Sequence, residues 1–185
     1  MNKTNRIKLF TSLAVLLINL VCTACVYIFP IETSVFKIIG SFAAIFIVSI
    51  AVWVFPVRFY ISSLIFVVFA SSLGSCVNFY YYFDAYDKIV HYLSGLLLFE
   101  GGRIIIEYIN RRRKLIEDRV VVSAFALLFS CSCAAFWEIY EYISDCLINS
   151  NMQGLNCNTM GDIIAGVLGA VTSFFAYFLQ KKIKD

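Results

Sequence analysis

The segment Leu9–Phe29 has the sequence LFTSLAVLLINLVCTACVYIF, with no Asp, Glu, Lys or Arg in it. A helix of about 20 residues spans about 30 Å, which is the thickness of the hydrocarbon core of a bilayer. Inside lipid every backbone N–H and C=O group must be bonded within the segment, so an apolar run of this kind is expected to be a helix. The Tyr27-Ile28-Phe29-Pro30 end is a poor cleavage site for a signal peptide, so we expect a retained membrane-spanning helix.

Five further apolar runs follow this one, at Val35–Phe55, Phe59–Phe79, Ile89–Ile109, Val120–Ile143 and Gly161–Leu179. The chain is 61% hydrophobic and 15% charged, whereas soluble domains are about 45–50% apolar and about 25% charged. This composition excludes a soluble enzyme, a nucleic-acid-binding domain and a disordered chain. We therefore predict an all-α polytopic membrane protein, in which residues 1–185 form a single bundle of six transmembrane helices and the lipid bilayer is the first partner.

The positive charges predict the orientation of this bundle, because loops rich in Lys and Arg stay on the cytoplasmic side. With the N-terminus inside, twelve of the 15 Lys and Arg residues fall in cytoplasmic segments, including the cluster Arg111-Arg112-Arg113-Lys114. Only Lys37 and Lys88 fall outside. We expect a multi-pass protein of the cell membrane with both termini in the cytoplasm.

Ionisable side chains within the hydrocarbon are costly, so each one is a candidate functional group. Eight interrupt the apolar runs, namely Lys37, His91, Glu100, Arg103, Glu107, Glu138, Glu141 and Asp162. Helical periodicity places most of them on narrow faces of the last three helices, together with small residues that allow close approach between membrane helices. These faces hold Asp87, His91, Ser94, Gly95 and Gly102 in the fourth helix, Ala134, Glu138, Glu141 and Asp145 in the fifth, and Asp162, Ala165, Gly166, Gly169 and Ser173 in the sixth.

The polar residues of these three faces are also expected at one depth. His91 lies near the outer start of its helix, and Glu138 lies about 8 Å below the outer end of the next helix at 1.5 Å per residue. Glu141 and Asp162 are shallower. The sequence therefore predicts a polar pocket in the outer leaflet, built where the three faces pack together.

A second polar stripe on the fourth helix contains Glu100, Arg103 and Glu107. Glu100 is near the middle of the membrane, where an uncompensated charge is unfavourable, so Arg103 at i+3 is its expected partner. We interpret Glu100 and Arg103 as a structural ion pair, with a proton or ion path as the alternative.

Three stretches carry a resemblance to a known group of proteins. They are Asp87-Lys88-Ile89-Val90-His91 with Gly95, Trp137-Glu138-Ile139-Tyr140-Glu141, and Gly161-Asp162-Ile163-Ile164-Ala165-Gly166 with Gly169. In this order and spacing they resemble the VanZ-like small bacterial membrane proteins and the related YjdF-type proteins, over about Ala85–Ala170. Gly166 replaces a VanZ-type Asn, and the outer loop carries Asn and Cys instead of Arg or Asp. Both departures favour the YjdF-type side. The resemblance implies candidate residues and no particular reaction.

One hypothesis for these residues is an outward-facing membrane enzyme that acts on a lipid or a lipid-linked envelope substrate. His91, Glu138, Glu141 and Asp162 are the candidate catalytic residues, because clustered carboxylates beside an imidazole suit acid–base chemistry. Asp87, Lys88, Ser94 and Asp145 are candidates for substrate binding. If a metal is present, Asp87, His91, Glu138 and Asp162 are its candidate ligands, and this donor set suits Mg²⁺, Mn²⁺ or Ca²⁺ better than structural Zn²⁺.

Two other functions fit the same residues. The protein could transport a small molecule, with proton coupling through Glu100, or it could be a non-catalytic accessory protein whose acids and His91 only hold the helices together. The sequence does not choose among the three. It also leaves the oligomeric state open.

Seven cysteines occur in the chain. Five lie within the apolar runs, where cysteine commonly serves as a small apolar side chain. Cys146 and Cys157 flank the predicted outer loop, where oxidation is permitted. A disulfide between them is one candidate arrangement, and free thiols or metal ligation are the alternatives.

Overall fold

The computed structural model describes residues 2–114, 118–150 and 152–182, and this part of the chain is helical without any strand. Two compact units are distinguished, Met1–Val90 and His91–Asp185. The boundary falls within one continuous helix, α5 (Tyr86–Arg113). A single domain over residues 1–185 therefore stays a prediction, and each unit is described by itself below.

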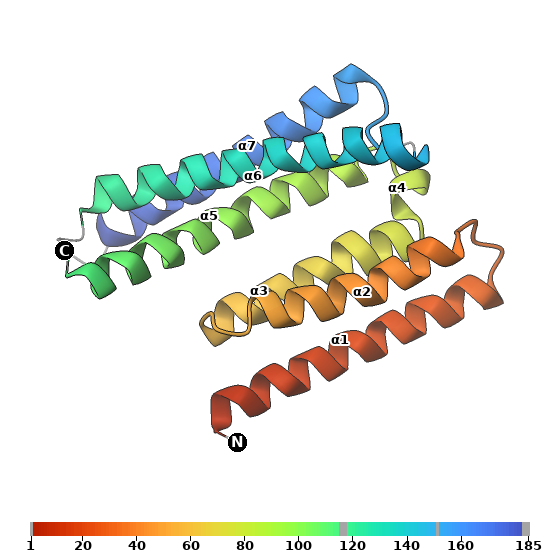
Figure 1. The fold of residues 1–185 in the computed structure, drawn as a ribbon, viewed down its shortest axis with the longest axis horizontal. Coiled ribbons are helices and arrows are strands. Elements are labelled where there is room, and N and C mark those ends of the chain that lie inside the picture. The colour runs from red at the N-terminus through yellow and green to blue at the C-terminus, as the bar shows by residue number, and fades with distance from the viewer. Residues whose placement is uncertain (1, 115–117, 151, 183–185) are drawn as a thin grey trace. The chain divides into compact units, whose positions relative to one another are not determined.

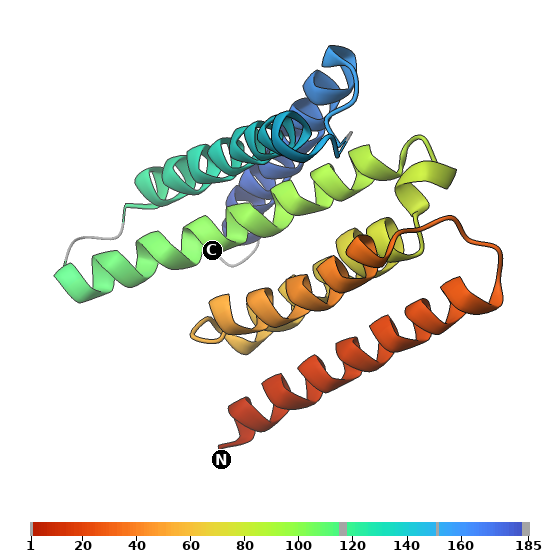
Figure 2. The same cartoon turned by 45° about the vertical axis from the view of Figure 1, so that its right-hand side comes forward.

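The first unit contains three long helical segments side by side (Figures 1 and 2). They are α1 (Lys3–Ile28), α2 (Val35–Ala51), and α3 (Val57–Val67) continued by the π-helix η1 (Val68–Cys76). A single turn, α4 (Phe79–Tyr82), follows. The Ser12 and Tyr60 hydroxyl oxygens are 2.6 Å apart, and Thr23 Oγ1 is 3.8 Å from Cys76 Sγ. These two contacts show that α1 runs alongside the whole of α3 and η1.

The turn between α2 and α3 is held by a buried lysine. Lys8 Nζ donates hydrogen bonds to the backbone oxygens of Trp53 at 2.5 Å and Phe55 at 2.7 Å, and it lies over the Trp53 ring. Its side chain therefore supplies donors to carbonyl groups that have no helical partner beyond the end of α2. The predicted run Val35–Phe55 is thus shortened, because α2 ends at Ala51 and the chain turns before Pro56.

The predicted run Phe59–Phe79 also differs in its details. The helical segment begins at Val57 and ends at Cys76, and its last nine residues are wound as a π-helix. Asn78 then adopts a left-handed conformation with φ of 66°, which reverses the chain. Lys37 Nζ donates to Asn78 Oδ1 at 2.7 Å, so this lysine at the start of α2 stabilises the turn.

The second unit contains α5 from His91 onward, α6 (Arg119–Ile148) and α7 (Asn156–Lys182). All three are longer than the apolar runs, because a helix continues through polar residues where it leaves the hydrocarbon. The small-residue faces pack together as predicted. A Cβ atom on Gly169 would lie 2.0 Å from the Tyr92 carbonyl oxygen, and one on Gly166 would lie 3.1 Å from Ala134 Cβ.

Within the described residues, five helices are long and apolar enough to cross a membrane, at Lys3–Ile28, Val57–Cys76, Tyr86–Arg113, Arg119–Ile148 and Asn156–Leu179. The other apolar helix, α2, has 17 residues and is shorter. Large apolar side chains such as Phe10, Phe46 and Phe136 are two-thirds or more exposed, as expected of surfaces that face lipid. The all-α, membrane-spanning fold is confirmed, whereas six full-length spans are not. The cytoplasmic location of both termini stays a prediction.

Candidate functional site

The centre of the candidate site is a buried imidazole beside a buried carboxylate. His91, in the second turn of α5, and Glu138, ten residues before the C-terminal end of α6, are 6% and 4% exposed. His91 Nε2 lies 3.7 Å from Glu138 Oε1. The two residues are 47 positions apart in the sequence, so the contact depends on the packing of α5 against α6. Ser130 supports that packing by donating a hydrogen bond to the Gly95 carbonyl oxygen at 3.0 Å.

Asp162 supplies a second buried carboxylate from α7. Its side chain is completely buried, and Asn158 Nδ2, one turn earlier on the same helix, donates to Asp162 Oδ2 at 2.8 Å. This hydrogen bond limits the rotation of the carboxylate. The orientation of Asp162 is therefore set within α7 itself.

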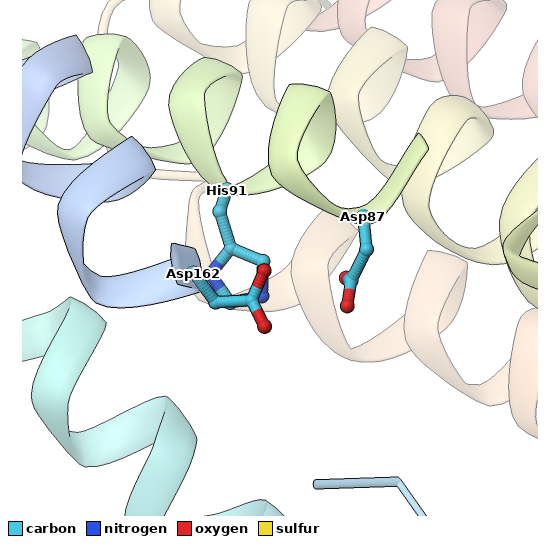
Figure 3. A group of neighbouring side chains, drawn as sticks. All are labelled: Asp87, His91 and Asp162. Atoms are coloured by element: carbon cyan, nitrogen blue, oxygen red, sulfur yellow. The ribbon is translucent and has the colours of Figure 1, made fainter. Parts of the chain in front are cut away.

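Asp87 joins His91 and Asp162 in a group of three potential metal ligands. Asp87, His91 and Asp162 each offer one ligand atom, and these atoms all lie within 4.8 Å of one another. Asp87 precedes His91 by one turn of the continuous helix α5, and Figure 3 shows both side chains on the side of this helix where Asp162 lies. Of the three, His91 and Asp162 are buried and Asp87 is half-buried. Three ligands from two helices that approach one point can hold a cation and leave other coordination positions for water or substrate.

Glu141 lies one turn from Glu138 on the same face of α6. It is 7% exposed, and Trp137 Nε1 donates to Glu141 Oε1 at 2.8 Å. Three acids of the predicted pocket, Glu138, Glu141 and Asp162, are therefore buried in this unit. Burying several carboxylates together is unfavourable unless protons or cations offset the charge.

Asp145 and Ser94, predicted to bind substrate, make hydrogen bonds to the backbone and to a neighbouring loop. Asp145 binds the loop after α6, accepting hydrogen bonds from the Ser150 hydroxyl at 2.5 Å and from the backbone N–H groups of Met152 at 2.7 Å and Gln153 at 3.0 Å. The Ser94 hydroxyl donates to the His91 carbonyl oxygen at 2.7 Å. Both residues thus have contacts that shape the surroundings of the site. Lys88 is half-buried next to Asp87 in the first turn of α5.

The predicted ion pair of α5 is present. Arg103 donates to both carboxylate oxygens of Glu100, at 2.5 Å and 2.8 Å, and also to Glu107 Oε1. The Arg103 guanidinium additionally lies 5.8 Å from the centre of the Tyr177 ring on α7. Glu100 and Glu107 therefore belong to a separate cluster around Arg103, about two and a half to four and a half turns along α5 from His91.

The seven cysteines are free thiols in the structure. Cys146 in α6 and Cys157 in α7 are exposed, and the structure does not contain a disulfide between them. The bridge stays a prediction for an oxidising environment.

Two residues of the site were not predicted from the sequence, Asn158 and Trp137. Each precedes the acid that it contacts by four positions, so the i, i+4 spacing within a helix was the available signal. Asn158 lies outside the predicted run Gly161–Leu179, because α7 begins five residues earlier than hydropathy indicates.

Residues 9–182 match a protein family described as "Predicted membrane protein (DUF2238)". The chain belongs to this family. The match includes α5, α6 and α7 with all of the residues described above, and it agrees with the apolar helices in assigning the chain to the membrane as a multi-pass protein. No curated protein and no solved structure matches the chain significantly.

Proposed function

We propose that this protein holds a divalent cation at Asp87, His91 and Asp162 and uses it to bind or act on a lipid or envelope-linked substrate that carries an anionic group. The observation that carries the proposal is the convergence of three ligand atoms within 4.8 Å of one another at two buried side chains and one half-buried side chain. We also propose a relationship to the VanZ-like and YjdF-type proteins, because the resemblance rests on the same residues. In this proposal the site opens to the outside of the cell.

The donor set favours a hard cation. Two carboxylates and one imidazole suit Mn²⁺ well, and Mg²⁺ and Ca²⁺ prefer carboxylate oxygens. A divalent cation would also balance the negative charge that Asp162, Glu138 and Glu141 bring into the unit. It would present its remaining coordination positions to a phosphate or carboxylate of the substrate as a Lewis acid.

Glu138 has the position of a residue that orients the histidine. An imidazole has two nitrogen atoms, and metal-binding histidines generally direct the second one to a carboxylate, a carbonyl group or water. Glu138 lies 3.7 Å from Nε2 of His91 and is buried with it. In a reaction, the same pair could move a proton between the imidazole and a bound substrate.

The location fits a substrate at the membrane surface. His91 and Asp162 are the sixth and seventh residues of α5 and α7, so the site lies one to two turns inside the ends of these helices. In the predicted orientation this level would be the boundary between the hydrocarbon core and the lipid headgroups. The anionic group of a lipid-linked substrate would reach the cation while its lipid chain stays in the membrane.

The first experiment measures Mn²⁺ binding to the purified full-length protein in phosphatidylcholine nanodiscs by electron paramagnetic resonance. We expect one site per chain in the wild type and loss of that site in Asp162→Asn and in His91→Ala. The matched control is Glu107→Gln, which removes a carboxylate of α5 that contacts Arg103 instead. Nanodiscs that also contain phosphatidic acid should strengthen Mn²⁺ binding in the wild type, because the cation and the anionic headgroup would bind together.

The same measurements separate the alternatives. Mn²⁺ binding that does not respond to anionic lipid would favour a cation or small-molecule transporter. Wild-type protein that binds no Mn²⁺ would contradict the proposal and favour the accessory role, in which His91 and the acids only hold the helices together.

A further inference from the structure

The first unit contains a layer of buried polar side chains between two apolar clusters. One cluster is formed by Val15, Ile45, Tyr60, Leu64 and Val67, and the other by Cys22, Val26 and Cys76 with Ile38 packed against it. Asn19 of α1, Ser41 of α2 and Ser72 of η1 separate them along the three helices. We call these three residues the polar layer.

The spacing shows that the polar layer faces the interior. Asn19 is four residues after Val15 and three before Cys22, and both neighbours belong to the clusters. Ser41 is three residues after Ile38 and four before Ile45, and Ser72 is four residues before Cys76. Side chains three or four positions apart share one face of a helix. The exposed fractions agree, at 0% for Asn19, 1% for Ser41 and 0% for Ser72.

Two members of the layer have polar atoms without a hydrogen-bond partner among the described residues. They are both amide atoms of Asn19, Oδ1 and Nδ2, and the hydroxyl oxygen of Ser72. The Ser41 hydroxyl donates to the Ile38 carbonyl oxygen at 2.7 Å and retains its acceptor capacity. In a membrane interior such groups are unfavourable unless they are hydrogen-bonded, and bulk water does not reach this depth.

The backbone beside Ser72 is unusual as well. The nine residues Val68–Cys76 are π-helical, and Ser72 lies at their centre. A π-helix is rare, is wider than an α-helix, and is frequently found at functional sites. The π-helical backbone is therefore a second unusual feature of the polar layer, separate from its unpartnered side-chain atoms.

We propose that the polar layer binds water in the interior of the first unit, with the side chains of Asn19 and Ser72 as the hydrogen-bond partners of the water. Asn19 offers two N–H donors at Nδ2 and an acceptor oxygen at Oδ1, and the Ser72 hydroxyl can donate or accept. A bare cation would leave the Asn19 N–H group buried without an acceptor, and an anion would leave its oxygen without a donor. Water supplies both functions and requires two to four polar partners, which this layer provides. The site lies entirely within Met1–Val90 and does not depend on the proposed cation site.

Radiolytic hydroxyl-radical labelling of the full-length protein in nanodiscs, read by mass spectrometry, tests this proposal. Radicals formed from a bound water oxidise adjacent sulfur atoms, and Cys22 and Cys76 are buried directly beside the layer. We expect both cysteines to be oxidised in the wild type, and to incorporate ¹⁸O after rapid mixing with labelled water. Asn19→Leu and Ser72→Ala should each reduce this oxidation at least threefold.

The matched control is Ser63→Ala, which removes a buried hydroxyl from the same span. Ser63 donates to the Phe59 carbonyl oxygen at 2.8 Å, so its loss should leave the labelling of Cys76 unchanged. Ser72→Ala removes a single oxygen atom and keeps the test decisive if Asn19→Leu does not fold. Cysteines that remain unoxidised in the wild type, or that are oxidised equally in Ser72→Ala, would overturn the proposal.

Discussion

A Cβ atom on Gly95 would stand 2.0 Å from the carbonyl oxygen of Gly166, so α5 and α7 touch through their main chains. His91 lies one turn before Gly95, and Asp162 lies one turn before Gly166. Since each site residue precedes its glycine by four positions, the contact between the glycines sets the distance between the imidazole and the carboxylate. The close packing of the small residues in α5 and α7 therefore also determines where the polar residues of these helices lie.

Gly95→Ala should destabilise the protein. The added methyl group meets backbone atoms, which cannot rotate away, and overpacking of this kind costs about 1–3 kcal/mol and sometimes more. We expect a lower midpoint in thermal unfolding of the detergent-solubilised protein, together with weaker Mn²⁺ binding because α7 moves away from α5.

Gly40→Ala is the matched control for this substitution. No atom lies within 4 Å of a Cβ placed there, and the residue is the sixth of the 17 residues of α2, inside the helix. Alanine is favoured over glycine inside a helix by about 1 kcal/mol, so this variant should be as stable as the wild type or more stable. Equal stability of Gly95→Ala and Gly40→Ala would show that α5 and α7 are not in main-chain contact.

Glu138→Gln should weaken Mn²⁺ binding without removing the site. The amide preserves the shape of the side chain but not its charge, and loss of an outer-shell carboxylate typically costs about 10–100-fold in metal affinity. Titration by electron paramagnetic resonance should still give one site per chain. Glu138→Asp should recover part of the affinity. If Glu138→Gln binds Mn²⁺ as tightly as the wild type while Asp162→Asn does not bind it, Glu138 has only a structural role.

The sequence predicted where the apolar helices lie because the absence of charge over about 20 residues is a requirement of the bilayer itself. It predicted the small-residue faces for a similar reason, since glycine and alanine recur at helical spacing in Gly95, Ala134, Gly166 and Gly169. The positions of His91, Glu138 and Asp162 on those faces follow from the same periodicity. The structure brings these three residues together, as shown by the contact between His91 and Glu138 and by the group of Asp87, His91 and Asp162.

Features set by backbone geometry were not predicted. The π-helix from Val68 to Cys76 has no compositional signal, and the left-handed Asn78 that follows it looks like any polar residue near a membrane surface. The early end of α2 at Ala51 depends on Lys8, which is distant in sequence. Hydropathy also detects only the apolar stretch of a helix and not its polar ends. The predicted starts of α1 and α7 were therefore several residues too late.

Arg103→Met should destabilise the second unit. Removal of the guanidinium leaves Glu100 and Glu107 without their shared cation, and breaking a fully buried pair in this way costs about 3–5 kcal/mol. The Glu100 side chain is 45% exposed, so we expect a smaller loss, about 2 kcal/mol in chemical unfolding. Arg103→Met combined with Glu100→Gln and Glu107→Gln should recover most of this stability. A triple variant as unstable as Arg103→Met would show that packing of Arg103 against Tyr177 matters more than its charge.

Cys146 and Cys157 provide a direct test of the orientation predicted from the positive charges. Both thiols are exposed, at the end of α6 and the start of α7. If the termini are cytoplasmic, a membrane-impermeant maleimide should label them in intact cells, and the double variant Cys146→Ser/Cys157→Ser should lose that labelling. Labelling only after reduction would demonstrate the disulfide that their flanking positions suggest. Labelling only in permeabilised cells would reverse the topology and place the site of His91 and Asp162 at the cytoplasmic surface.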